Sequence, residues 1–452
     1  MGAAADSTDA RQQRYVYLTE TPVPRLIASL SVPTIISMLV SGLYNMADTF
    51  FVGRISTEAT AAVGVVFSLM AVIQALGFFC GHGSGNFLSR KLGEGKVQEA
   101  SEMAATGFAL AFLLGLVLLV LGQLFLEPLS FLLGATAAIL DDTQRYMRII
   151  LVGAPCMMSQ LVINNQLRFQ GSAVYAMVGL VSGAVLNIAL DPLFIFVLGM
   201  GVSGAALATV VSQFAAFCVL LVGSRRGANL RLRLGNIRFS SRYLLQIANG
   251  GAPSLFRQGL ASVSAVVLNT AAGSLGGEAA IAGMAVVTRV MMLANSALIG
   301  FGQGFQPVCS FNYGAKRYAR VREGFFFCVR YGTVFLLFMA ALCIAFAPEI
   351  VAFFRSDPAV VAVGTVALRC QAAVFPLGAY IVMSNMFLQS IGKGVKASIM
   401  AASRNGLFFI PFMLVLSSLL GLSGVEMTQM FADICAFLLA LPLAMSELRK
   451  LG

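Results

Sequence analysis

The chain consists of apolar stretches that are each long enough to cross a lipid bilayer. Runs of about twenty mostly apolar residues recur from Leu26 to Met445, separated by charged residues, Gly and Pro. Only 11% of the residues are charged, whereas soluble domains carry about 25%. This pattern predicts a polytopic membrane protein. It excludes a secreted or cytosolic enzyme and a nucleic-acid-binding protein.

Twelve transmembrane helices are expected. Continuously apolar segments of this length favour helices over the strands of a barrel, because a transmembrane strand needs only about ten residues. The predicted spans are 27–51, 59–83, 100–123, 144–167, 174–198 and 203–222 in the first half, and 247–273, 278–303, 325–347, 361–388, 395–419 and 425–446 in the second. The predicted fold class is an all-α polytopic membrane protein.

The distribution of Lys and Arg predicts the orientation of the chain. Basic residues near the ends of spans are retained in the cytoplasm. With a cytoplasmic N-terminus, the inner segments hold most of the basic residues, including those from Arg225 to Arg242, and the outer loops hold only Arg54 and Arg355. Both termini are therefore predicted to be cytoplasmic. The stretch from Arg225 to Arg242 can also lie against anionic lipid headgroups.

The two halves of the sequence form an internal repeat with an offset of roughly 220 residues. Matching positions include Pro33 with Pro253, Pro192 with Pro411, and GVSG (201–204) with GLSG (421–424). Six spans per half is an even number, so both halves enter the membrane in the same orientation. We expect two six-helix lobes related by a pseudo-twofold axis along the membrane normal.

The repeat also predicts the division of the chain. We expect a cytoplasmic N-terminal segment (1–26), an N-lobe (27–222), a basic cytoplasmic linker (223–246), a C-lobe (247–446) and a cytoplasmic tail (447–452).

Two carboxylates are predicted to lie inside the membrane in the first half. Asp48 is in span 1 and Asp191 in span 5, each a few residues from the outer end, so they share one depth. Tyr44 and Asn187 precede them by one helical turn and therefore lie on the same helical faces. Thr209 lies in the outer third of span 6. Because a charge in the membrane is costly, these groups are candidates for function.

The chemistry of this group suits a small cation. If the two carboxylates approach each other in a dry pocket, lost solvation and mutual repulsion favour a bound proton. Alternatively, the carboxylates hold Na⁺ together with oxygens of Asn187 and Thr209. The structural alternative is that Asp48 caps a helix end and Asp191 is satisfied beside Pro192.

The second half carries intramembrane bases instead. Asp433 is its single well-buried acid, and the spans contain Arg257, Arg289, Arg369 and Arg404. Ion coupling is therefore expected in the first half. The arginines are expected to line a watery cavity or to pair with Asp433 and backbone carbonyls, and direct binding of substrate is the alternative.

Further polar and flexible side chains are candidates for a substrate cavity. Gln160 and Asn164 share one face of span 4, with Tyr146 nearer its outer end, although such groups also serve as hydrogen bonds between helices. Met284 and Met291 on span 8 can form a deformable wall, or simply pack. The predicted cavity set is Tyr146, Gln160, Asn164, Met284, Met291, Arg257, Arg289 and Arg404. His82, the single histidine, has no Cys or acidic neighbours that would make a metal site.

The combined pattern resembles the MATE family of multidrug and toxic compound extrusion transporters. It rests on the twelve spans, the duplication, YNMADTFFVGR (44–54) and NIALDP (187–192). FRQG (256–259) and SRNG (403–406) are similar to the bacterial MepA-like group near the DinF branch. The resemblance covers nearly the whole chain. It implies a V-shaped transporter, not an enzyme, that exports cationic or amphiphilic compounds across the bacterial inner membrane in exchange for H⁺ or Na⁺.

The resemblance also assigns roles by position. It implies a coupling site, possible for Na⁺, at Asp48, Asn187, Asp191 and Thr209 with Tyr44, a bend of span 1 at Pro33, and a cavity faced by Tyr146, Gln160 and Asn164. No cofactor is expected. The expected partners are small molecules and membrane lipids, without nucleic acid, and the protein is expected to be a monomer.

Two other functions are alternatives to the transport of drugs. A flippase for lipid-linked saccharide precursors would use the arginines to bind pyrophosphate. An intramembrane enzyme would need a nucleophile or a metal motif such as HExxH, and the sequence has none.

Overall fold

The computed structural model describes residues 2–226 and 229–451, and every regular element in these ranges is helical. The long helices of the first half are α2 (Val23–Val52), α3 (Thr57–Gly93), α4 (Val97–Leu124), α6 (Leu140–Phe169), α7 (Ala173–Pro192) and α8 (Gly201–Ser224). Those of the second half are α9 (Ser241–Gly314), α10 (Tyr318–Ala345), α12 (Pro358–Val374), α13 (Leu377–Ser390), α14 (Gly394–Ala402), α15 (Phe409–Leu420) and α16 (Leu422–Leu448).

The described ranges contain the twelve predicted spans. Ten helical segments are long and apolar enough to cross a membrane, and α12 with α13 makes one more span with a bend of 58°. At 1.5 Å per residue, α9 would be roughly 110 Å long if it were straight. It reverses at Gly277, whose φ of 64° and ψ of −156° are readily adopted only by glycine. Helix α9 therefore crosses twice.

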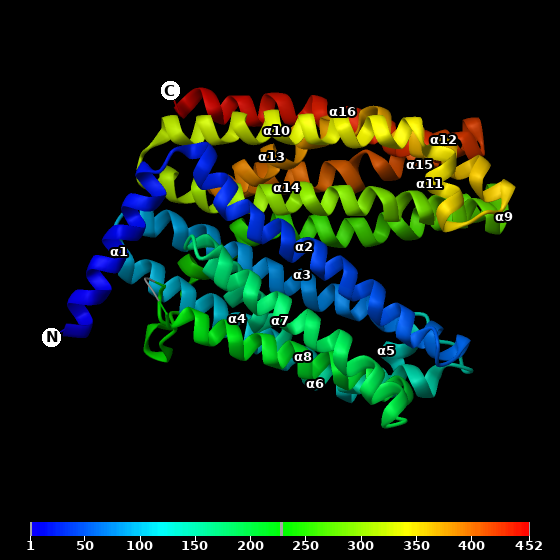
Figure 1. The fold of residues 1–452 in the computed structure, drawn as a ribbon, viewed down its shortest axis with the longest axis horizontal. Coiled ribbons are helices and arrows are strands. Elements are labelled where there is room, and N and C mark those ends of the chain that lie inside the picture. The colour runs from blue at the N-terminus through cyan, green and yellow to red at the C-terminus, as the bar shows by residue number, and fades with distance from the viewer. Residues whose placement is uncertain (1, 227–228, 452) are drawn as a thin grey trace.

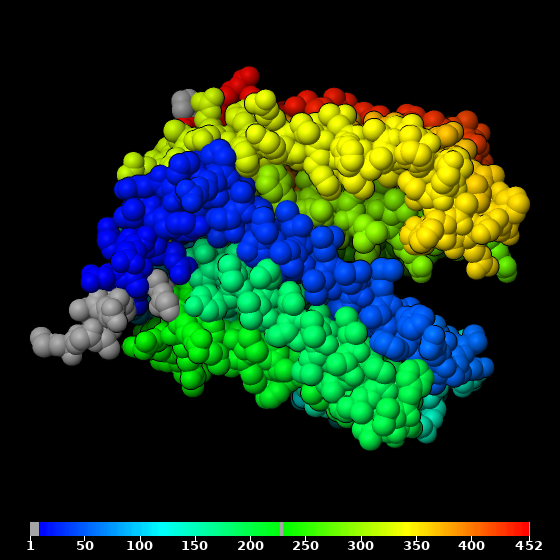
Figure 2. All heavy atoms as spheres, viewed as in Figure 1, coloured from blue at the N-terminus to red at the C-terminus, as the bar shows by residue number. Residues whose placement is uncertain are grey.

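The spans form two bundles that meet at one end. Helices α2–α8 form the N lobe and α9–α16 form the C lobe, and both chain ends lie where the lobes converge (Figure 1). At the opposite end the lobes separate and leave a cleft between them (Figure 2). We call these ends the closed end and the open end. The closed end carries both termini, which the distribution of basic residues predicts to be cytoplasmic.

The backbone confirms the internal repeat. Helices α4 and α10 both have 28 residues, and their bounds are related by one offset of 221 (97 to 318, and 124 to 345). The same offset relates Gly171, which follows α6 with a φ of 81°, to Gly392, which follows α13 with a φ of 82°. Equivalent turns at equivalent positions indicate that each half folds on the same backbone plan.

The lobes contact each other most closely through α3 and α9. A side-chain carbon at Gly93 would overlap the Phe311 carbonyl oxygen, and one at Gly314 would overlap the Arg90 carbonyl oxygen. The offset of 221 relates Gly93 to Gly314 and Arg90 to Phe311. The two contacts are therefore symmetry equivalents, and the pseudo-twofold axis passes between them at the closed end.

Three shorter helices were not predicted from the sequence. Helix α1 (Gly2–Glu20) lies in the segment expected only to be polar, and α5 (Leu126–Leu132) and α11 (Ala347–Phe354) occupy equivalent positions in the two repeats. Helix α1 is fixed to the N lobe because Arg14 donates hydrogen bonds to the Gln170 carbonyl oxygen (2.9 Å) and to Ser172 Oγ (2.6 Å). Such long-range contacts are not readable from local sequence pattern.

Gly93→Ala tests the close approach at the closed end. We expect the substitution to destabilise the protein by about 1–3 kcal/mol because the added methyl group meets backbone that cannot move away cheaply. The measurement is the thermal unfolding midpoint of the purified protein in detergent. Gly64→Ala, in the same helix with open space around the new carbon, is the control. Equal midpoints for the two variants would contradict this packing.

Candidate functional site

Two buried carboxylates lie near each other inside the N lobe. Asp48 on α2 and Asp191 on α7 have exposed fractions of 3% and 0%, and they are close enough for their charges to interact. No basic side chain of the described residues forms an ion pair with either one. The residues predicted to share one depth are therefore brought together by the fold.

Asn187 joins this pair to α8. Its amide nitrogen lies 3.5 Å from Asp191 Oδ1 and 3.5 Å from Thr209 Oγ1. With the amide turned over, its nitrogen donates to Asp191 Oδ2 at 3.2 Å and its oxygen accepts from the Thr209 backbone nitrogen at 3.3 Å. The second arrangement gives each amide atom a complementary partner, so it is the better assignment.

Asp48 is left with an oxygen that has no partner. Its Oδ1 is buried and accepts no hydrogen bond from any described residue. A buried polar atom without a partner costs free energy. This oxygen is therefore free to accept a proton or to bind a cation.

Two tyrosines flank the cluster. Tyr44 lies one turn before Asp48, with its hydroxyl toward Gln213 of α8. Tyr146 on α6 is fully buried and lies near Thr209, but its hydroxyl makes no hydrogen bond with the described residues. The structure thus places Tyr146 at the carboxylate cluster, whereas the sequence predicted it in the substrate cavity.

The N lobe contains a small neutral cavity next to this cluster. Its volume is about 200 Å³, and its lining includes the predicted residues Tyr44 and Gln160 together with Gln213 and Phe78. The lining contains no charged side chain. Neutral and aromatic walls suit an apolar or weakly polar compound.

Asn164, predicted either to face a cavity or to bond neighbouring helices, is outside the lining of this cavity. Its amide nitrogen donates to the Ala176 carbonyl oxygen at 2.8 Å and thereby joins α6 to α7. The equivalent residue of the second repeat, Asn385, donates to Ala397 at 2.7 Å. The same bond therefore joins equivalent helices in both lobes.

The C lobe contains a larger cavity of about 640 Å³. All the C-lobe residues predicted for a substrate cavity line it, namely Met284, Met291, Arg257, Arg289 and Arg404. Arg404 also forms a two-point ion pair with Asp433, with distances of 2.7 Å from Nε to Oδ1 and 3.0 Å from Nη2 to Oδ2. Arg369 is outside the lining, and its Nε donates to the Ile344 carbonyl oxygen at 3.3 Å.

A network of polar side chains crosses between the lobes at the closed end. His82 of α3 lies between Arg168 Nη2 of α6 (3.0 Å) and Ser254 Oγ of α9 (2.8 Å). Arg168 also donates to Gln303 of α9, and Gln389 of α13 donates to Ser254 at 3.0 Å. We call these five residues the closed-end network. Sequence reasoning missed it, because the only signal was an isolated histidine amid glycines.

Helix α2 connects the carboxylate cluster to the other lobe. In its first half, Thr34 Oγ1 donates to the Gly300 carbonyl oxygen at 2.6 Å and Ser31 Oγ to Phe301 at 3.1 Å, both on α9 of the C lobe. In its second half, α2 carries Asp48 and packs on α7 of the N lobe. Pro33, which leaves one helical hydrogen bond unmade, lies at the junction with the C lobe.

Comparisons with known proteins agree with this architecture. Residues 33–193 and 253–415, one stretch in each half, match the family model described as MatE. The chain is 26% identical to the Multidrug export protein MepA of Staphylococcus haemolyticus over 432 residues, 95% of each protein.

Solved structures give the same result. A crystal structure of MATE in the bent conformation superimposes with a TM-score of 0.91 at 27% identity, over 97% of this chain and 98% of that one. An outward-facing multidrug resistance MATE family transporter of the MOP superfamily gives 0.90 at 27% identity, over 96% and 98%.

Ser254→Ala tests the closed-end network. Loss of the hydroxyl leaves His82 and Gln389 with unsatisfied buried groups, which costs about 1–3 kcal/mol. We expect a lower thermal unfolding midpoint in detergent. Ser262→Ala is the matched control on the same helix, because that exposed hydroxyl bonds only to the carbonyl of Gln258. Unfolding at the wild-type temperature would show that the network contributes nothing to stability.

Proposed function

Because this chain belongs to the MatE family, we propose that it is an antiporter that exports amphiphilic or cationic small molecules in exchange for H⁺ or Na⁺. The proposal places it in the bacterial inner membrane with both termini in the cytoplasm. The curated relative is a multidrug export protein, which supports drugs as cargo. The observation that carries the coupling is the buried carboxylate pair with its unpartnered oxygen on Asp48.

The carboxylate cluster can change its charge where charge is expensive. Two nearby negative charges in a buried site repel each other and lose their solvation. A proton that bridges or neutralises them relieves both costs. The open cleft faces outside in the proposed topology (Figure 2). Ions that move inward would therefore reach the cluster from the outside.

The same cluster offers oxygen ligands that would hold Na⁺. Hard cations bind carboxylate, amide and hydroxyl oxygens, and Asp48, Asp191, Asn187 and Thr209 supply these groups. The unpartnered Asp48 oxygen fits such a role. When bound, Na⁺ would supply positive charge to the carboxylates, as a proton does.

Helix α2 is the proposed connection between the cation and the lobes. A change in hydrogen bonding at Asp48 acts on α2, and the other half of α2 is bonded to α9 in the C lobe. Pro33 lies within the segment bonded to α9, between Ser31 and Thr34, and permits a bend there. Coupling requires that cation and cargo prefer different states of the protein.

Efflux from proteoliposomes tests the coupling site. The cargo is a fluorescent lipophilic cation, and a pH gradient and a Na⁺ gradient are imposed separately. We expect one gradient to drive efflux and expect Asp48→Asn and Asp191→Asn each to reduce it at least tenfold, since an amide neither loads a proton nor carries charge.

The matched control is Asp141→Asn, because Asp141 is an exposed acid that pairs only with Arg145 on the same helix. The proposed coupling site would be contradicted if Asp48→Asn, at an equal amount of folded protein, showed gradient-driven efflux at the wild-type rate. Loss in the control as well would point to a general effect of removing a charge.

Pro33→Ala tests the bend in α2. Alanine restores the missing helical hydrogen bond and favours a straight helix, so we expect gradient-driven efflux to fall severalfold while the protein remains folded. Pro253→Ala, the repeat equivalent in the lobe without the carboxylate pair, is the comparison. Equal losses in the two variants would mean that the proline of α2 has no special part in coupling.

A further inference from the structure

We propose that the C-lobe cavity is a binding site for amphiphiles that carry an anionic group, with Arg257 and Arg289 as the anion ligands. This inference deepens the proposed function, since it assigns a substrate class to the second lobe. A carboxylate, sulfonate or phosphate ester on an apolar body has the chemistry that fits.

The cavity has a surplus of positive charge. Its charged lining residues are Arg257, Arg289, Arg404 and Asp433, so three guanidinium groups face one carboxylate. Guanidinium groups stay protonated in proteins. The described part of the lining therefore carries a net charge of +2, in a region where a charge without a counterion is costly.

The ion pair in the cavity identifies which arginines remain available. Asp433 accepts two hydrogen bonds from Arg404 and one from Gln429 at 2.7 Å, so its charge is committed to Arg404. Arg257 makes one long bond of 3.4 Å to the Asn385 amide oxygen. Arg289 has no ion pair with any described acid, and it is exposed on the wall of the cavity.

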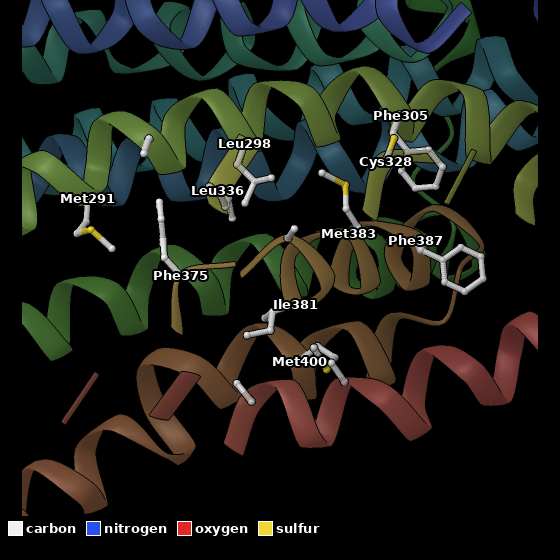
Figure 3. Packing of buried hydrophobic residues seen from close by; sticks show 14 of the residues in the cluster. Met291, Leu298, Phe305, Cys328, Leu336, Phe375, Ile381, Met383, Phe387 and Met400 are labelled. Atoms are coloured by element: carbon white, nitrogen blue, oxygen red, sulfur yellow. The ribbon is translucent and has the colours of Figure 1, made fainter. Parts of the chain in front are cut away.

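The rest of the cavity suits the apolar part of such a ligand. Met291, Ile381 and Met400 contribute to the lining and belong to the packed apolar cluster of this lobe (Figure 3). A volume of about 640 Å³ is within the range of roughly 300–1,000 Å³ of small-molecule pockets. Amides of Gln258, Asn295 and Gln371 supply further donors.

The two lobes therefore differ in the ligand charge that they favour. The N-lobe cavity has an uncharged lining beside two carboxylates, whereas the C-lobe cavity has unpaired guanidinium groups. A cationic group is repelled from the second cavity and an anionic group is attracted. This difference explains arginines whose presence is hard to reconcile with a transporter of cations alone.

Binding of two dyes with opposite charge tests the proposal. Dansylglycine carries a carboxylate and dansylcadaverine an ammonium group on the same fluorophore. The signal is the emission of the dansyl group, excited directly, because the chain has no Trp to transfer energy to it. The titration uses the purified full-length protein in phosphatidylcholine nanodiscs.

We expect the affinity of dansylglycine for Arg257→Gln and for Arg289→Gln to be at least tenfold lower than for the wild-type protein. Each variant loses a charge-assisted hydrogen bond to the carboxylate. Arg369→Gln is the matched control, since it removes the same charge from the same lobe outside the cavity. Unchanged affinity in both cavity variants, or an equal loss in Arg369→Gln, would overturn the proposal.

Asp433→Asn is expected to change the affinity for dansylglycine in the opposite direction. It frees Arg404 and raises the positive charge of the cavity, so we expect tighter binding of dansylglycine, an outcome that misfolding cannot produce. Weaker binding in a folded Asp433→Asn protein would overturn the proposal. None of these titrations requires transport, so failure of cation-driven efflux leaves this test intact.

Phosphatidylglycerol in the nanodiscs distinguishes two sources of the anion. If this lipid displaces dansylglycine from wild-type protein and the effect is lost in Arg257→Gln and Arg289→Gln, the site accepts a lipid headgroup. If the dye still binds at its original affinity, the site prefers a free amphiphile. If the lipid still displaces the dye from both variants, the lipid binds elsewhere. If the two variants also bind the dye with unchanged affinity, the assignment of these arginines is overturned.

Discussion

The cost of placing charge and unpaired polar groups inside a bilayer governs this structure. Backbone groups satisfy the requirement by forming helices, since the membrane supplies no water to bond them. Side chains differ in how far they satisfy it: Arg404 pairs with Asp433 and Arg168 is held by neutral partners, but Asp48 retains an oxygen without a partner among the described residues. The proposed cation coupling depends on this unpartnered oxygen of Asp48.

The two lobes share one backbone plan but differ in the charge of their buried side chains. Equivalent glycines, turns and the Asn164 and Asn385 bonds maintain the same helix packing. The cluster of acids occurs in one lobe and the arginine-lined cavity in the other. A pair of similar scaffolds around one cleft can thus present opposite charge preferences, because side chains facing a cavity are less constrained than those between helices.

The contacts between the lobes would link a local change in one lobe to the position of the other. The closed end is held by two symmetry-equivalent glycine contacts and by the closed-end network, while α2 of the N lobe also contacts α9 of the C lobe. Packed interfaces of this type move between discrete arrangements rather than deforming continuously. In the proposed mechanism, α2 transmits a change at Asp48 to the other lobe.

The sequence by itself determined the spans, the duplication and which residues lie at one depth, because each of these follows from hydropathy, helical spacing and the order of the chain. It also identified Asp48, Asp191 and the arginines as unusual, since polar residues in apolar runs are visible without coordinates. Only the tertiary structure decided that Tyr146 joins the carboxylate cluster, that Asn164 bonds α7, that His82 links the lobes, and that Arg404 is neutralised while Arg257 and Arg289 are not. These facts depend on which helix faces lie against each other across distant segments, and local sequence pattern does not encode that arrangement.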